Sequence, residues 1–264
     1  MGTCMVRMDK APVENQAVAM NVLGIDIGGS AVKGAPVNLA TGKFLAERFR
    51  IETPERITPR RMAKAVAEIA EHFKWRGRIG IGYPGVVQGS VLKTAANLHL
   101  GFVDCDFGQR VSKATHCRVR VINDADAAGL AEMRFGAGKG KKGTVMLFTL
   151  GTGIGSAIFR HGLLFPNSEL GHLPYKGRAF EKYAAASVRK ARGLSWHEWG
   201  KRLDQYLAMI EVLFWPDLII LGGGVSAKND KFFRYLKTRA PVVPARLFNG
   251  AGIVGAALHG GADA

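Results

Sequence analysis

Three glycine-rich stretches of the chain have the composition of phosphate-binding turns. GIDIGGS at residues 24–30, GTG at 151–153 and GGG at 222–224 each follow an apolar run. Because glycine has no Cβ, the backbone N–H groups of such a turn can converge on a phosphate. An aspartate beside the turn can hold the waters of a Mg²⁺ ion that is itself bound to the phosphates. The predicted donor-binding residues are Asp26, Gly28, Gly29, Ser30, Lys33, Gly151, Thr152, Gly153, Gly222, Gly223 and Gly224.

Two familiar nucleotide-binding motifs are excluded by their context. GTGIGS at 151–156 opens a predicted strand, whereas a Rossmann fingerprint opens a helix. GAGKGKKGT at 136–144 lacks the Gly-Lys-Ser/Thr ending of a P-loop. The glycine turns therefore predict phosphate binding by hairpins.

VINDADAAGLAE at residues 121–132 supplies the candidate general base. Asp124 follows an apolar strand and precedes a helix, so its side chain can project from the strand end into a cleft. There it can accept a proton from a substrate hydroxyl while Asn123 orients that substrate. The alternative interpretation is that Asp124 is only the N-cap of the helix. Asp126 is the second candidate for either role.

NSELGHLP at residues 167–174 places Glu169 and His172 one helical turn apart, if this segment is helical. Together they offer hydrogen-bond partners suited to vicinal hydroxyl groups. A structural histidine is an equally good interpretation. A metal site lacks support, because no cysteine cluster or third ligand follows in order.

Alternating and helical apolar patterns indicate the elements that must position these residues. Residues 21–27, 31–39 and 44–52 predict an antiparallel meander, followed by a helix within 57–75 and strands within 78–87 and 117–123. A helix over 124–135, a second strand–glycine–strand unit at 143–160 and a final helix at 251–260 follow. PDLIILGGGVSAKNDKFFRYLKTRA, residues 216–240, predicts a strand, a glycine turn and a helix whose apolar face is Phe232, Phe233 and Leu236.

The repeated hairpin predicts two similar domains that face a cleft. The expected boundaries are a loose leader at 1–20, an N-terminal α/β domain at 21–123 and a C-terminal α/β domain at 124–249. The last helix, about 250–260, is expected to pack back on the first half.

Composition and charge narrow the class of protein. The 264 residues are 47% hydrophobic, with no run near the roughly 18 apolar residues of a membrane span. Three cysteines without CxxC spacing predict neither disulfides nor a zinc ribbon, so we expect a cytoplasmic protein. The net charge is +16, with 19 basic and 8 acidic residues in 134–264. Such a surplus attracts polyanions, namely nucleic acid, an anionic membrane or a phosphate polymer, unless it is only a solvated surface.

The motifs occur together in an order that resembles the ROK family of sugar kinases. They are GIDIGGSAVKG, GYPGVV, TAANL, NDADAAGLAE, GTGIGSAI, ELGH and LGGGVS, and the resemblance covers residues 21 to about 258. It is closer still to the polyphosphate glucokinase branch of the family, through WRG, YPGVV, TAAN, FGAGK, AAASVR and PVVPA. The resemblance implies an α/β, actin-like (ribonuclease H-like) two-domain fold with a central cleft.

The resemblance also implies an activity and its residues. The activity is phosphoryl transfer from polyphosphate and ATP to the 6-hydroxyl of glucose, with mannose as a second candidate, and with Mg²⁺ accompanying the donor. Asp124 matches the catalytic base of the family. The matching sugar-binding positions are Asn97, Asn123, Glu169 and His172.

One departure from the family pattern bears on metal binding. Many ROK kinases carry a cysteine-rich zinc loop after the ELGH-like segment, and this chain reads ELGHLPYKGRAFEKYAAAS without cysteines. We therefore expect no zinc and no direct metal ligands, with His172 free to face the sugar. Glu181 keeps the place of a family glutamate that contacts the sugar.

A polyphosphate donor would explain the surplus of positive charge, because a chain of phosphates binds along a series of basic groups, called the basic track below. A solvated surface is the alternative for each cluster. The candidate track residues are Lys139, Lys141, Lys142, Arg189, Lys190, Arg192, Lys228, Lys231 and Arg234.

Other functions remain as alternatives at this stage. The alternatives are an ATP-only hexokinase, a sugar-sensing regulator and an actin-like ATPase without a sugar. For a regulator, about 20 residues before Val22 leave no room for a helix-turn-helix, so we expect no nucleic-acid partner. Sugar preference, donor preference and the choice between monomer and homodimer are not determined by the sequence.

Overall fold

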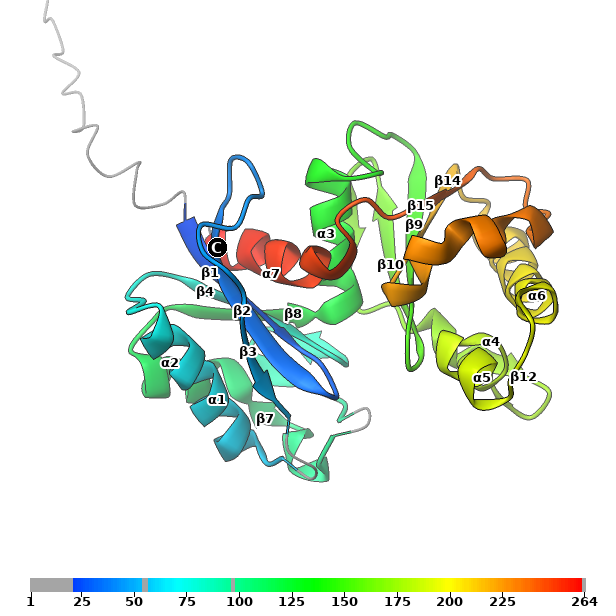
Figure 1. The fold of residues 1–264 in the computed structure, drawn as a ribbon. Helices are drawn as coiled ribbons and strands as arrows, with labels where there is room; N and C mark the ends of the chain where they lie inside the picture. Colours follow the sequence, from blue (N-terminus) through cyan, green and yellow to red (C-terminus); the bar gives the residue numbers. More distant parts are fainter. Residues whose placement is uncertain (1–20, 54–56, 96–97, 263–264) are drawn as a thin grey trace, which may run out of the picture.

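Two five-stranded sheets of matching topology form the framework of the molecule (Figure 1). The computed structural model describes residues 21–53, 57–95 and 98–262. The strand order is β3-β2-β1-β4-β8 in the first sheet and β11-β10-β9-β14-β15 in the second. The first sheet consists of β1 (Asn21–Ile27), β2 (Ala31–Asn38), β3 (Phe49–Glu52), β4 (Ile79–Tyr83) and β8 (Val119–Asn123). The second consists of β9 (Thr144–Leu150), β10 (Ile154–Arg160), β11 (Leu163–Phe165), β14 (Leu218–Gly222) and β15 (Val242–Pro244).

In each sheet an antiparallel hairpin is followed by two parallel strands. The hairpin β1–β2 pairs Asp26 with Lys33 beside its turn, and β9–β10 pairs Leu150 with Ile154. β4 and β8 extend the first sheet in parallel, as β14 and β15 extend the second. The predicted repetition of the glycine hairpin is confirmed.

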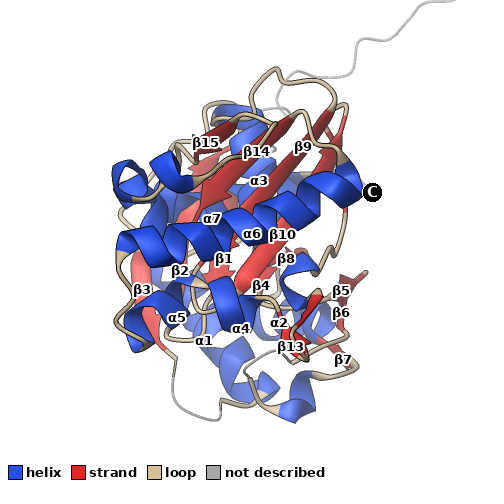
Figure 2. Cartoon of the chain, turned by 90° about the vertical axis from the view of Figure 1, so that its right-hand side faces the viewer, coloured by secondary structure: helices blue, strands red, loops and turns tan. Residues whose placement is uncertain are grey.

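Helices separate and cover the two sheets (Figures 1 and 2). α3 (Asp124–Phe135) and α7 (Ala251–Gly261) pack against each other between the sheets, since α7 contacts β1 and β4 while α3 contacts β9 and β10. α1 (Pro59–His72) and α2 (Phe107–Thr115) pack on the other face of the first sheet. α6 (Trp196–Phe214) covers the other face of the second sheet.

The alternation of side chains along β9 explains this layering. Val145 and Leu147 belong to the core that faces α3 and α7, whereas Met146 and Phe148 belong to the core beneath α6. Successive side chains of a strand point to opposite faces, so a sheet covered on both sides reads as a continuous apolar run.

Glycines let α7 approach the first sheet and α3 closely. A Cβ on Gly24 would overlap the carbonyl oxygen of Ile253, and one on Gly80 would overlap that of Ala256. On the opposite side of α7, a Cβ on Gly255 would overlap the carbonyl oxygen of Ala127. α7 is therefore wedged between the first sheet and α3.

Short elements complete the described part of the chain. The strands are β5 (Val87–Gln88), β6 (Val91–Leu92), β7 (Cys105–Asp106), β12 (Pro174–Tyr175) and β13 (Arg178–Ala179). The helices are α4 (Glu181–Ala184), α5 (Ala186–Ala191) and the 3₁₀ helices η3 (Leu100–Phe102), η4 (Leu170–His172), η5 (Gly224–Lys231), η6 (Phe233–Tyr235) and η7 (Phe248–Gly250). Within the described ranges, none of the helices is long and apolar enough to cross a bilayer.

Two predicted elements differ from the structure. The single helix predicted after GGG is wrong, because residues 224–231 and 233–235 form two short 3₁₀ helices, η5 and η6. Ser226 Oγ donates to Gly223 O and Asn229 Nδ2 donates to Ser226 O, and such local bonds compete with α-helical ones. The strand predicted at 44–52 is also too long: only Phe49–Glu52 pairs as β3, and Phe44 forms an isolated bridge.

Candidate active site

Asp124 lies where β8 ends and α3 begins. Asn123 Oδ1 accepts hydrogen bonds from Ala125 N (2.9 Å) and Asp126 N (3.0 Å), so Asn123 is the N-cap of α3. The interpretation of Asp124 as the N-cap is therefore wrong. Asp124 Oδ1 accepts one bond, from Ala125 N at 2.8 Å, and Asp124 lines the pocket described next.

A pocket of about 170 Å³ joins the ends of both sheets to the first turn of α7. Asp26, Lys33 and Asp124 line it from the first sheet and α3. The remaining lining residues are Ala128, Glu132, Leu147, Thr149, Gly222, Gly223, Ala245, Phe248, Asn249, Ala251 and Gly252. This pocket, called the donor pocket below, contains only part of the predicted phosphate-binding set.

Two helices begin at the donor pocket. α3 begins at Asp124 and α7 at Ala251, and no side chain caps α7 at Gly250. The first N–H groups of a helix have no partner within the helix and carry partial positive charge. Ala125 N, Asp126 N and Ala251 N already have acceptors, so it is the dipoles of the two helices that favour anionic phosphates in this pocket.

The two aspartates of the donor pocket have perturbed acidities. Burial is the main cause that raises the pKa of Asp124 to about 7, and the neighbouring Asp26 carboxylate adds to the increase. Burial also raises the pKa of Asp26, although the Lys33 ammonium acts in the opposite direction. Both shifts follow mainly from placing a carboxylate in a poorly hydrated space, and a neighbouring like charge contributes only to that of Asp124. Asp124 is consequently a stronger base than an ordinary aspartate and is still deprotonated in a large fraction of molecules near neutral pH.

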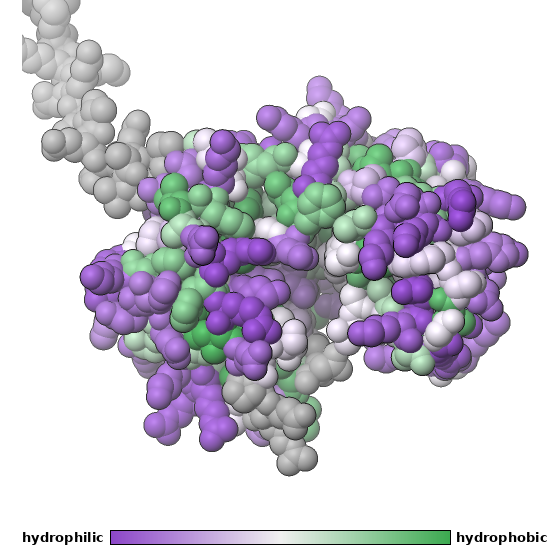
Figure 3. Space-filling model, viewed as in Figure 1, coloured by the Kyte–Doolittle hydropathy of each residue, from purple (hydrophilic) through white to green (hydrophobic). Residues whose placement is uncertain are grey.

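The two glycine turns form the tips of the hairpins β1–β2 and β9–β10, both on the lower side of Figure 1. Neighbouring hydroxyl groups hold them: Thr53 Oγ1 donates to Gly28 O (3.1 Å) and Ser187 Oγ donates to Thr152 O (2.6 Å). The exposed tip residues are Gly29, Ser30, Gly151 and Thr152. They lie outside the donor pocket proper, and Figure 3 shows that the surface is hollowed where the two halves meet.

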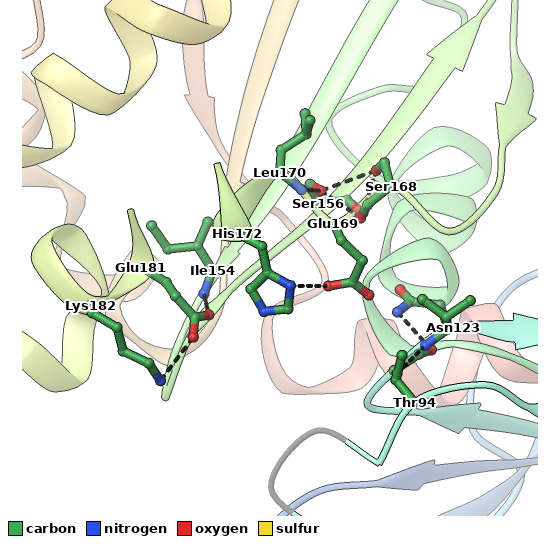
Figure 4. A network of polar contacts seen from close by, with 12 residues as sticks. Thr94, Asn123, Ile154, Ser156, Ser168, Glu169, Leu170, His172, Glu181 and Lys182 are labelled. Atoms are coloured by element: carbon green, nitrogen blue, oxygen red, sulfur yellow. Dashed lines mark hydrogen bonds and ion pairs between the residues drawn. The ribbon is translucent and has the colours of Figure 1, made fainter. Parts of the chain in front are cut away.

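Glu169 and His172 face each other across one 3₁₀ turn (Figure 4). Glu169 Oε2 lies 3.8 Å from His172 Nδ1, and the side chains are 32% and 63% exposed. Burial raises the pKa of Glu169, while His172 opposes the shift and Glu181 reinforces it. Both side chains are accessible to a ligand.

Glu181 connects the predicted sugar side to the second glycine hairpin. It is the first residue of α4, its Oε2 accepts from Ile154 N (3.2 Å), and its Oε1 lies 3.0 Å from Lys182 Nζ. A Cβ on Gly153 would overlap Glu181 Oε2. An alanine at position 153 would therefore displace the Glu181 carboxylate from its present place.

The structure describes one of the two asparagines that are predicted to contact the sugar. Asn123 is buried, its Oδ1 caps α3, and its Nδ2 donates to Gly85 O (3.1 Å), so among the described residues one Nδ2 hydrogen has no acceptor. Asn97 lies outside the described residues. Both assignments stay predictions.

Asp126, the second candidate base, points away from the donor pocket. It is fully buried, its Oδ2 accepts from Asn167 N (2.7 Å), and burial raises its pKa to about 7. It borders a larger cavity of about 730 Å³ along β8, which lacks Asp124 and both glycine hairpins. The geometry therefore favours Asp124 as the base.

The structure separates the predicted basic track into two regions. Lys139, Lys141 and Lys142 are exposed and follow the C-terminus of α3, whose 12 residues put this loop roughly 18 Å from the Asp124 end. Arg189 and Lys231 instead converge on one ring: their cationic groups lie 3.8 and 5.8 Å from the Trp196 centroid. The remaining track residues Lys190, Arg192, Lys228 and Arg234 are exposed.

Metal ligands are not clustered in the described part of the chain, where no group of three or more His, Cys, Asp or Glu side chains could hold an ion. Two pocket carboxylates, Asp26 and Asp124, nevertheless offer the oxygen ligands that Mg²⁺ prefers through its waters. The pocket thus fits a Mg²⁺ ion carried by donor phosphates, and the absence of zinc stays a prediction.

Comparison with known proteins identifies the relatives of the chain. The sequence profile of the ROK family matches residues 22–184, which is more than half of the chain. The chain belongs to the ROK family.

Individual ROK proteins are similar over nearly the whole chain. A polyphosphate glucokinase from Mycobacterium tuberculosis (strain CDC 1551 / Oshkosh) is 46% identical over 241 residues, covering 91% of each chain. The structure of an inorganic polyphosphate/ATP-glucomannokinase from Arthrobacter sp. strain KM matches with a TM-score of 0.86 and 46% identity over 90% of this chain and 97% of that one. A ROK family glucokinase from Streptomyces griseus, in complex with glucose and AMPPNP, gives a TM-score of 0.74 and 26% identity over 90% and 98%. The predicted actin-like fold of the ROK sugar kinases is confirmed.

Sequence reasoning missed one wall of the donor pocket. Glu132, Phe248 and Asn249 line it, and none of them was a predicted site residue. Glu132 closes the motif NDADAAGLAE, which was the available signal. The segment before α7 carries no local signal, because its place in the pocket depends on contacts distant in sequence.

Proposed function

We propose that this ROK protein transfers a phosphoryl group from inorganic polyphosphate or ATP to the 6-hydroxyl of glucose, with mannose as a second acceptor. The observation that carries the proposal is Asp124, a carboxylate with a pKa of about 7 in a pocket where two helices begin. The printed descriptions of its relatives, a polyphosphate glucokinase and a polyphosphate/ATP-glucomannokinase, support these substrates.

In the proposed reaction, an Asp124 carboxylate oxygen accepts the proton of the sugar 6-hydroxyl. The hydroxyl oxygen forms a bond to the terminal phosphorus of the donor, and the bond from that phosphorus to the bridging oxygen breaks. The shortened donor leaves with the electron pair of that bond. General-base assistance of this kind contributes roughly 10²–10⁴ in rate.

The donor phosphates are held by positive groups on both sides. Lys33 and the starts of α3 and α7 border the pocket. The exposed tip residues Gly29, Ser30 and Thr152 offer N–H groups to phosphates further along the donor, whereas Gly151 N donates to Gly153 O (3.0 Å). Asp26 and Asp124 would hold Mg²⁺ through its waters, and that ion would neutralise phosphate charge when the donor is bound.

The acceptor sugar is placed against the face of Glu169 and His172. The carboxylate accepts from a hydroxyl group while the imidazole offers a donor or an acceptor, and Glu181 stands beside them near the second hairpin. Because His172 is 63% exposed, we propose that the two halves close over the sugar and exclude water. Closure favours transfer to the sugar over hydrolysis.

Two observations support polyphosphate as a donor. The half of the chain from 134 to 264 carries 19 basic and 8 acidic residues. Arg189 and Lys231 meet at Trp196, which makes this cluster the better-supported part of the track. The lysine loop at 139–142 stays a prediction for longer chains, since it lies at the other end of α3.

A coupled sugar 6-phosphate assay tests the proposal with four substrate pairs: glucose or mannose, each with polyphosphate or ATP. We expect turnover of glucose with both donors. Turnover with ATP alone would identify an ATP-only hexokinase, and no turnover with any pair would refute the kinase proposal in favour of a sugar-binding regulator.

A further inference from the structure

Glu132 is a fully buried carboxylate on α3 that is held by backbone amides from two separate segments. Its Oε1 accepts from Arg246 N (2.9 Å) and Leu247 N (2.7 Å), and its Oε2 accepts from Ala137 N (2.8 Å). Within the described ranges no basic side chain forms an ion pair with it. Burying an ionised carboxylate costs free energy unless the carboxylate is hydrogen-bonded. These three N–H groups therefore stabilise the Glu132 carboxylate at its buried position.

The segment that Glu132 holds is the wall of the donor pocket. After β15 the chain passes through Arg246 and Leu247, presents Phe248 and Asn249 to the pocket, and then begins α7. Phe248 has a φ of +44°, an unusual conformation for a bulky side chain, and it is 54% exposed. Its own packing therefore does not account for this conformation, and the two residues just before it are the ones bound to Glu132.

The same segment sets the position of the N-terminus of α7. Ala251 and Gly252 line the donor pocket, and a Cβ on Gly252 would lie 3.0 Å from Asp26 Cγ. A shift of the segment would therefore move the first turn of α7 relative to Asp26. Glu169, His172 and Glu181 belong to other segments and are absent from this pocket.

We propose that Glu132 is a positioning residue for the phosphoryl donor. It fixes residues 245–250 and the start of α7 at the distance at which they border the donor phosphates, and it does not touch the sugar. The inference rests on the proposed kinase function. Because both ATP and polyphosphate present a terminal phosphate next to Asp26 and Asp124, the effect extends to both donors.

The chain offers a matched control in Glu211 on α6. Its two oxygens accept from Arg239 N (3.0 Å) and Ala240 N (2.7 Å), just before β15, whereas Glu132 binds the amides just after it. Glu211 lines neither of the two cavities described above. Glu211→Gln therefore perturbs the same kind of carboxylate–amide clamp without touching the donor wall.

The test compares Glu132→Gln with Glu211→Gln in steady-state kinetics and in calorimetric binding of a non-hydrolysable ATP analogue with Mg²⁺. We expect Glu132→Gln to raise the donor KM and the analogue Kd roughly tenfold, the scale of one lost hydrogen bond to a charged group, with the glucose KM within about twofold. Glu211→Gln should lower the melting temperature with unchanged donor KM.

The inference is overturned if Glu132→Gln leaves the donor KM and analogue Kd unchanged, if it raises the glucose KM equally, or if Glu211→Gln has the same kinetic effect. Should Glu132→Gln not fold, Glu132→Asp is measured by the same criteria, because it keeps the charge and withdraws the carboxylate by one methylene. Absence of turnover in the wild-type protein would instead refute the kinase proposal, and the analogue Kd would still decide the role of Glu132.

Discussion

Replacing Asp124 with asparagine is expected to reduce turnover and stabilise the fold at the same time. Asparagine keeps the shape of the side chain but cannot accept the proton of the 6-hydroxyl, so kcat should fall by about 10²–10⁴. The sugar Kd should change little, because Glu169, His172 and Glu181 are untouched.

The stability gain follows from the raised pKa of Asp124. The folded protein binds this proton with a pKa of about 7 against 3.8 for an unperturbed aspartate, so the wild type loses stability as the pH rises from 3.8 through 7. A pKa shift of about three units corresponds to roughly 4 kcal/mol in the free energy of unfolding. We expect Asp124→Asn to recover about half of this free energy, because the side chain is only partly buried. For a chain of this size, about 2 kcal/mol raises the melting temperature by roughly 4–8 °C.

The pH dependence of this gain distinguishes charge from packing. At pH 8 Asp124→Asn removes the whole free-energy cost of the ionised Asp124 carboxylate. At pH 5 only about two fifths of that cost is present in the wild type. Differential scanning calorimetry at pH 5 and pH 8, beside the kinetic assay, measures both. Equal melting temperatures at pH 8 would refute the electrostatic reasoning, and near-normal kcat would refute the role of Asp124 as the base.

Four further predictions test other parts of the site. The kcat/KM for glucose should rise with pH to a plateau above an apparent pKa of about 7, because Asp124 must be deprotonated, and a flat profile between pH 5.5 and 8 would contradict this. Gly153→Ala should raise the glucose KM about tenfold or more, because the new Cβ displaces Glu181, and unchanged kinetics would show that this carboxylate is not needed. Arg189→Glu combined with Lys231→Glu should raise the KM for long polyphosphate more than the KM for ATP, and should weaken the salt dependence of the KM for polyphosphate. Equal effects on both donors would indicate that the surplus positive charge serves only solubility. EDTA should abolish activity and Mg²⁺ restore it, while one stoichiometric zinc by elemental analysis would contradict the predicted zinc-free protein.

Features encoded by neighbouring residues were predictable from the sequence. The two glycine hairpins, the strand before Asp124 and the helix after it all follow from short runs whose period and turn residues agree. The 3₁₀ turn that brings Glu169 to His172 likewise needs only a three-residue spacing.

Features that depend on competition between local and distant contacts were not predictable. Asn123 rather than Asp124 caps α3, because both residue types are good caps and only the chain path selects one. The apolar spacing of Phe232, Phe233 and Leu236 indicated a single helix, yet Phe232 packs against Trp199 from a chain of 3₁₀ turns. The clamp by Glu132 joins residues more than 100 positions apart.

The wedge formed by α7 has a consequence for biosynthesis. The face of β1 and β4 that carries Gly24 and Gly80 is covered by a helix that begins at residue 251. The first sheet is complete at Asn123, so at ribosomal rates of 5–20 residues per second about 6–26 s pass before α7 begins to be synthesised. The N-terminal half is therefore expected to remain incompletely folded until α7 has been synthesised, and premature termination before residue 251 would yield a nascent chain dependent on chaperones.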